Sequence, residues 1–75
     1  MPKDKQFTLK TEYITLGQLL KAADIASGGG EAKLILAEGG ILINGVEDNR
    51  RGRKLWGGEH VVLPDGTCIR VRPPI

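Results

Sequence analysis

Apolar residues recur at helical spacing in the first half of the chain. Four of them stand at positions i, i+3, i+4 and i+7, namely Leu16, Leu19, Leu20 and Ala23. This is the pattern of a helix that buries one face. Thr15 directly precedes the pattern and Gln18 follows three residues later, which is the spacing of a capping box. The sequence therefore predicts an amphipathic helix that begins at Leu16.

A second helix is predicted between Ser27 and the pair Gly39-Gly40. Ser27 is the expected N-cap, and Glu31 falls in the early turns, where a negative charge complements the helix dipole. Three residues, 24–26, would join the two helices into an αα unit. The expected buried face comprises Ala32, Ile35 and Leu36.

Short apolar runs separated by turn residues follow the helices. Residues 41–43 lead into Asn44-Gly45, the strongest short-range hairpin signal, and a return strand begins at Val46. Residues 60–71 hold two further apolar runs on either side of Pro64-Asp65-Gly66, and this pattern predicts a second hairpin.

The alternation of apolar and polar residues at 7–9 indicates a short edge strand near the start of the chain. Strands combined with a helix pair favour the α+β class. We expect the helix pair to pack on one side of a small, mostly antiparallel sheet.

The length of the chain, 75 residues, favours one domain spanning residues 1–75 with a small core. Hydrophobic residues make up 40% and charged residues 27%, a composition typical of folded proteins. The single cysteine, Cys68, excludes an intrachain disulfide, and the charged residues 1–6 lack the apolar stretch of a signal peptide. No apolar run approaches the roughly 18 residues that span a bilayer. We expect a soluble cytoplasmic protein that does not associate with membranes.

Positive charge is concentrated in one short segment. The formal net charge is only +2, yet four of the eleven basic residues fall within five positions, namely Arg50, Arg51, Arg53 and Lys54. Such a local field attracts a polyanion, and guanidinium groups match phosphate geometry. The alternative is a solvated loop that Glu47 and Asp48 partly neutralise.

The turn Ser27-Gly28-Gly29-Gly30 resembles glycine-rich loops that bind anions through backbone amides at a helix N-terminus. It is not a P-loop, because the lysine and hydroxyl residue that end that motif are missing. A flexible turn is the alternative. Lys33, one helical turn later, either supplements such a site or is simply solvated.

Other residues with binding or catalytic potential have structural alternatives. Trp56 could stack on a base, although partial packing in the core is the favoured interpretation, and Asn49 either contacts RNA or turns the loop. Cys68 and His60 lack a third group at a spacing that would orient them for catalysis. The carboxylates show no metal-ligand spacing. We therefore expect no enzyme activity, no cofactor and no bound metal.

Several of these segments together resemble the S4 RNA-binding domain. The resemblance rests on residues 26–33 and 39–45, with 16–21 before them and 50–55 after them, and it spans about residues 14–62. More narrowly, the chain is similar to small stand-alone bacterial S4-like proteins of the YbcJ/YaaA type. This resemblance implies a cytoplasmic, non-catalytic protein that binds structured RNA, such as rRNA or tRNA, in association with the ribosome.

The chain departs from many S4 domains at two positions. The residue matching their helix-start arginine is Gly29, and Ala37 stands where another basic or polar residue is common. RNA contact would then depend on the backbone of residues 27–30, on Lys33, and on Asn49 with the basic segment 50–54. We expect a monomer without a small-molecule substrate. The alternative function is a protein-interaction module of a ribosome-associated complex.

Overall fold

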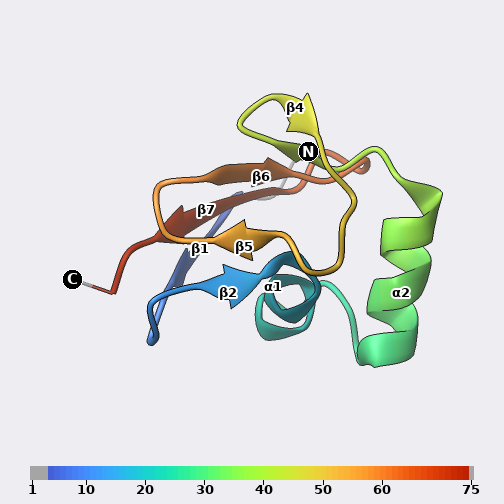
Figure 1. Cartoon of the computed structure of the whole chain (residues 1–75). Helices are drawn as coiled ribbons and strands as arrows, with labels where there is room; N and C mark the ends of the chain where they lie inside the picture. Colours follow the sequence, from blue (N-terminus) through green and yellow to red (C-terminus); the bar gives the residue numbers. More distant parts are fainter. Residues whose placement is uncertain (1–3, 75) are drawn as a thin grey trace.

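The computed structural model describes residues 4–74, so the ends of the predicted domain, residues 1–3 and 75, lie outside the described residues. Figure 1 shows a helix pair beside a sheet, which confirms the predicted α+β class. In chain order the elements are β1 (Asp4–Thr8), β2 (Ile14–Thr15), α1 (Leu16–Ala22), α2 (Gly29–Glu38), β3 (Leu42–Ile43), β4 (Val46–Glu47), β5 (Lys54–Leu55), β6 (His60–Val62) and β7 (Cys68–Arg72).

The main sheet has the strand order β1-β7-β6-β3-β4. Strand β1 runs parallel to β7 and the other neighbours are antiparallel, so the sheet is mostly antiparallel as predicted. The predicted edge strand is β1, although it covers residues 4–8 rather than 7–9. A separate antiparallel pair, β2 with β5, was not expected from the sequence.

Both predicted hairpins form. In the first, Asn44 (φ 53°) and Gly45 (φ 84°) adopt the left-handed backbone that a tight two-residue turn requires. The Asn44 side chain also accepts a hydrogen bond of 2.9 Å from the backbone amide of His60, which ties the turn to β6. In the second hairpin, β6 and β7 pair with Val61 opposite Ile69.

Helix α1 begins at Leu16, as the capping box predicts. The Thr15 hydroxyl accepts from the Gln18 amide at 3.3 Å, and the Gln18 side chain accepts from the Thr15 amide at 3.1 Å. The helix ends before Ala23, which is its C-cap. The connection to α2 spans residues 23–28, longer than the predicted 24–26, and within it Asp24 turns with a φ of 63°.

The predicted N-cap of the second helix is wrong. Gly28 is the N-cap of α2, and its carbonyl accepts the first helical hydrogen bond from Ala32 at 3.0 Å. The Ser27 hydroxyl instead donates to the Glu31 carboxylate at 3.1 Å, and no side-chain hydrogen bond caps the start of α2. Of the predicted buried face, Ala32 and Leu36 are buried, whereas Ile35 is only partly buried.

The core lies between the helix pair and the inner face of the sheet. Helix α1 contributes its predicted stripe of leucines, and the strands contribute branched residues from alternate positions. The fully or nearly fully buried side chains include Leu16, Leu19, Leu20, Ile41, Leu55, Val61, Ile69 and Val71. Because Leu55 belongs to this core, the short pair β2–β5 is fixed to the body of the protein.

Candidate nucleic-acid interface

The basic loop, residues 50–54, is fixed against the start of helix α1. The Leu16 amide donates to the Arg53 carbonyl at 2.8 Å, and the Gly17 amide donates to the Arg51 carbonyl at 3.0 Å. Amides in the first turn of a helix have no partner within the helix, so the loop satisfies two of them. Pairing of Thr15 with Lys54 continues the attachment into β5. The loop backbone therefore has a defined position.

Gly17 permits this close approach. A Cβ atom at this position would lie 2.8 Å from the Cγ of Arg51 and 3.4 Å from its carbonyl oxygen. A larger residue would have to displace the Arg51 side chain. Glycine lowers helix stability, and the contact with Arg51 gives the physical reason for its presence in the first turn of α1.

Asp48 orders two of the four cations. Its carboxylate accepts from Nε and Nη2 of Arg50 at 3.0 and 2.8 Å and from Nη1 of Arg53 at 2.7 Å. The Asp48 side chain is 9% exposed, whereas that of Arg50 is 73% exposed. Hydrogen bonding from Arg50, and to a smaller extent from Arg53, holds the pKa of Asp48 well below its usual value, although partial burial opposes the shift.

Glu47 does not pair with an arginine, contrary to the alternative in which both acidic residues neutralise the loop. Its carboxylate accepts from the Asn49 side chain at 2.9 Å and from the Gly40 amide at 3.2 Å. These two bonds, with that from Asn49 the stronger, lower the pKa of Glu47. Of these two acidic residues, Asp48 is therefore the one that partly neutralises the positive charge of the loop.

Asn49 holds the chain that leads into the loop. Its side-chain oxygen accepts from the Ile41 amide at 3.0 Å while its nitrogen donates to Glu47. Both ends of the amide are engaged within the protein, as expected of a residue that shapes the loop. A contact between Asn49 and RNA stays a prediction.

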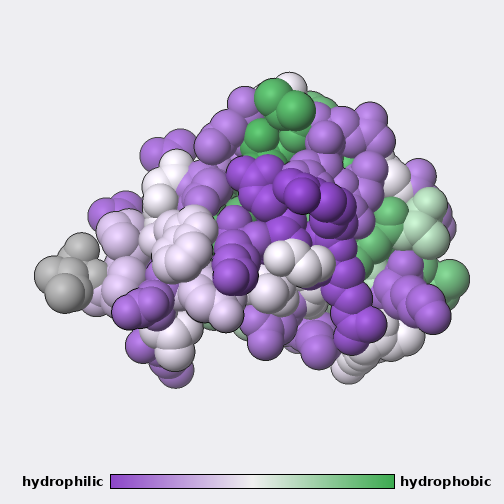
Figure 2. Space-filling model, in the orientation of Figure 1, coloured by the Kyte–Doolittle hydropathy of each residue, from purple (hydrophilic) through white to green (hydrophobic). Residues whose placement is uncertain are grey.

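Four cations and one paired carboxylate leave the loop with a local balance of about +3. Arg51 is exposed, and the Lys54 ammonium lies 4.9 Å from the centre of the Tyr13 ring. Figure 2 shows the most hydrophilic colours gathered across the middle of this face. The loop therefore presents a compact positive surface to solvent.

The turn 27–30 is a separate feature. Space beside the α carbons of Gly28, Gly29 and Gly30 is open, and Lys33 is exposed on α2. Within residues 4–74, no hydrogen bond or ion pair joins this turn to the basic loop. Figure 1 shows the first turn of α2 at the far end of that helix from the strand that follows it. The bond from Ser27 also places the Glu31 carboxylate beside the turn, where it disfavours an anion.

The carboxylate of Asp48 gives the fold a specific response to acid. The pKa of Asp48 is lower in the folded state than in the unfolded state, where it is near 3.8. The ionised carboxylate therefore stabilises the fold fully at a pH above the unfolded-state pKa, and this stabilisation is lost as the pH falls through the folded-state pKa. We expect wild type to exceed Asp48→Asn in unfolding free energy by about 1 kcal/mol at pH 7. Urea denaturation should show this difference shrinking below about pH 4. A difference that is constant from pH 7 to pH 2 would contradict the assignment.

The favoured interpretation of Trp56, partial packing in the core, is wrong, and no pattern in the sequence singled out Tyr13. Trp56 is 53% exposed rather than packed in the core, and its ring lies 5.0 Å from that of Tyr13. Trp56 directly follows β5, and its side chain is exposed whereas that of Leu55, the last residue of the strand, is buried. Tyr13 lies beside Trp56 because β2 pairs with β5, and a prediction of that pairing would have been needed to find Tyr13.

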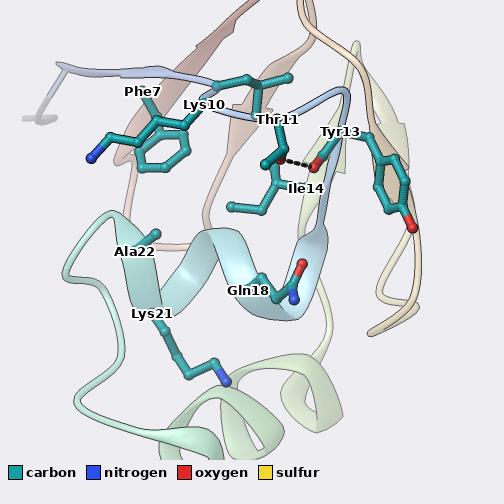
Figure 3. Close-up of a pocket in the computed structure, with 9 residues that line it drawn as sticks. Phe7, Lys10, Thr11, Tyr13, Ile14, Gln18, Lys21 and Ala22 are labelled. Atoms are coloured by element: carbon teal, nitrogen blue, oxygen red, sulfur yellow. Dashed lines mark hydrogen bonds between the residues drawn. The ribbon is translucent and has the colours of Figure 1, made fainter. Parts of the chain in front are cut away.

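A hollow of about 520 Å³ lies beside this aromatic pair, between the start of the chain and α1. Figure 3 shows Phe7 and Ile14 within it and the Tyr13 ring turned away from it. Lys10 and Lys21 also line the hollow.

Among residues 4–74, no group of three histidine, cysteine, aspartate or glutamate side chains is placed to hold a metal ion. None of the helices in this range has the length and apolarity to cross a membrane.

Comparison with known proteins identifies the family. A match to the S4 domain covers residues 7–72, a longer stretch than the 14–62 of the sequence resemblance. The chain is also 54% identical over 56 residues to the probable ribosome maturation protein RlbA of Bacillus subtilis (strain 168). That alignment covers 75% of this chain and 79% of the relative. The family that the sequence motifs predict is thereby confirmed, and the chain belongs to the S4 domain family.

Proposed function

We propose that this protein binds structured RNA without catalysing a reaction and acts in the cytoplasm as a ribosome maturation factor. The observation that carries the proposal is the basic loop, whose backbone is fixed on the N-terminus of α1 and whose side chains form a positive surface. Membership of the S4 family and similarity to a probable ribosome maturation protein support rRNA as the ligand, with tRNA as the second choice.

Phosphate groups are the RNA atoms that suit this surface. Arg51 and Lys54 are exposed and make no ion pair with the carboxylates of residues 4–74, so their charges are available. Arg50 uses two of its donor nitrogens on Asp48 and keeps the third, Nη1, for a ligand. Asp48 thus reduces the total charge but holds two guanidinium groups in a fixed orientation, which lowers the entropy cost of binding.

The proposed recognition is by shape and backbone. A-form RNA exposes phosphates and 2′-hydroxyls across a wide minor groove, and contacts to these groups position a protein without reading sequence. Arginine side chains stay protonated at neutral pH, so they bind anions well and transfer protons poorly. This chemistry suits a binding role rather than an enzymatic one.

The turn 27–30 and Lys33 form a second, weaker contact in this proposal. Open space beside the three glycines would let a phosphate approach the backbone amides at the start of α2. The neighbouring Glu31 carboxylate reduces the attraction. We therefore assign most of the affinity to the basic loop.

The salt dependence of binding tests the proposal. Titration of the wild-type protein with purified bacterial rRNA fragments, over a range of KCl concentrations, should give a linear plot of log affinity against log salt. Three to four phosphate contacts correspond to a slope of about −2 to −3.5. A flat response would favour the alternative function, a protein-interaction module, because such an interface does not release condensed counterions from RNA.

A further inference from the structure

Two exposed aromatic rings border the basic loop. Ile14 pairs with Leu55 at the end of the β2–β5 pair, and Tyr13 and Trp56 are the adjacent residues along the chain, just outside the two strands. The ring centres are 5.0 Å apart and the planes are inclined by 49°. Since Leu55 points into the core, the side chain that follows it points to solvent.

It is uncommon for most of the aromatic residues of a small domain to lie on its surface. The chain has three aromatic residues, and two of them meet here on the surface, with Trp56 53% and Tyr13 37% exposed. Isolated apolar residues on a surface need no explanation, but an aromatic pair beside a cluster of cations does. Proteins that bind unpaired nucleotides combine these two features.

The backbone on both sides of the rings is held in place. The Trp56 and Gly57 amides each donate to the Glu59 carboxylate at 2.8 Å. Gly57 has a φ of 110°, and a Cβ atom there would lie 2.7 Å from the Cα of Pro73, so the turn packs tightly against the C-terminal segment. The Tyr13 carbonyl accepts from the Thr11 hydroxyl at 2.9 Å. Binding of a ligand to the rings would therefore require little additional ordering of this backbone.

Charge beside the rings selects the ligand. The Lys54 ammonium lies 4.9 Å from the centre of the Tyr13 ring, a cation–π contact that places a phosphate-binding group at the edge of the aromatic pair. A nucleotide whose phosphate binds this ammonium has its base within reach of the rings. Because the two rings are inclined, a flat base can lie parallel to one of them only, and Trp56 is the more exposed.

The geometry points to a base-stacking site in which Trp56 stacks on an unpaired RNA base next to the phosphates bound by the basic loop. Tyr13, which directly precedes β2, packs against the indole. This inference rests on the proposed function and deepens it, because it defines the ligand as folded RNA with an unpaired nucleotide, such as a hairpin loop or a bulge, rather than a continuous duplex.

The sole tryptophan provides a direct test. The probes are an RNA hairpin with an unpaired loop and a blunt RNA duplex with the same number of phosphates. We expect the hairpin to quench Trp56 fluorescence and the duplex to leave it nearly unchanged. Trp56→Ala should weaken hairpin binding about tenfold while leaving the duplex affinity and the salt slope of both RNAs unchanged. Trp56→Phe, which keeps an aromatic face, should retain most of the hairpin affinity.

The outcomes separate this inference from the proposed function. If the wild-type protein binds neither RNA, both fail. Suppose that both RNAs bind with the expected salt dependence. If Trp56→Ala then changes neither affinity, or lowers both equally, the stacking site is wrong and RNA binding stands. An unchanged affinity for both RNAs would favour a protein partner for the aromatic pair. Leu34→Ala, which removes an apolar side chain that is 66% exposed on α2, is the matched control. Thermal denaturation of each variant checks its fold.

Discussion

Replacing Arg50, Arg51, Arg53 and Lys54 with glutamine is expected to lower RNA affinity on the order of a hundredfold or more at 0.1 M salt, because release of about three counterions is lost. Asp48 should become asparagine in the same variant, since removal of both arginines would otherwise leave its nearly buried carboxylate without its charged partners. The salt slope should flatten by about one unit for each contact removed. Filter binding at several KCl concentrations measures both quantities.

The matched control removes the same net charge elsewhere. Lys10, Arg70 and Arg72 are exposed and lie outside the loop, and their joint replacement with glutamine changes the net charge by −3, as the loop variant does. We expect the control to bind RNA within a few-fold of wild type. If the folded loop variant kept wild-type affinity while the control lost it, the RNA would instead contact the outer face of β7. Circular dichroism must show native helix and strand content in both variants.

Leu55→Ala is expected to remove about 2–5 kcal/mol of unfolding free energy. The side chain is fully buried, and Leu55 stands between Lys54, in the same strand, and Trp56, which directly follows it. In a domain this small the loss is a large fraction of total stability. Urea denaturation measures the change, and Leu34→Ala on the surface should stay within about 0.5 kcal/mol of wild type. A cost below about 1 kcal/mol for Leu55→Ala would show that β5 is not anchored as described.

Local signals made most of the fold predictable. The spacing of Thr15 and Gln18 sets the start of α1, because both partners of a capping box lie within one helical turn. Asn44-Gly45 sets the first hairpin in the same way, since only residues tolerant of positive φ fit that turn. The N-cap of α2 is predicted one residue too early, at Ser27, because the sequence pattern does not show that this hydroxyl bonds to Glu31.

The candidate site was predictable only in part. Clustering along the sequence reveals the basic loop, but the pairing of β2 with β5 joins residues about 40 positions apart, and no local pattern encodes it. That pairing brings Tyr13 to Trp56 and sets the loop on α1. The ion pairs of Asp48 with Arg50 and Arg53 are likewise not predictable from a local pattern, because they depend on the folded path of the loop.

The way the loop is attached to α1 bears on how such a protein can diversify. Leu16 and Gly17 bond to the carbonyl oxygens of Arg53 and Arg51, and every amino acid supplies that oxygen. Side chains at these two positions can therefore change without loss of either bond. Mutation or protein engineering can retune the charge that faces a ligand while the supporting scaffold persists.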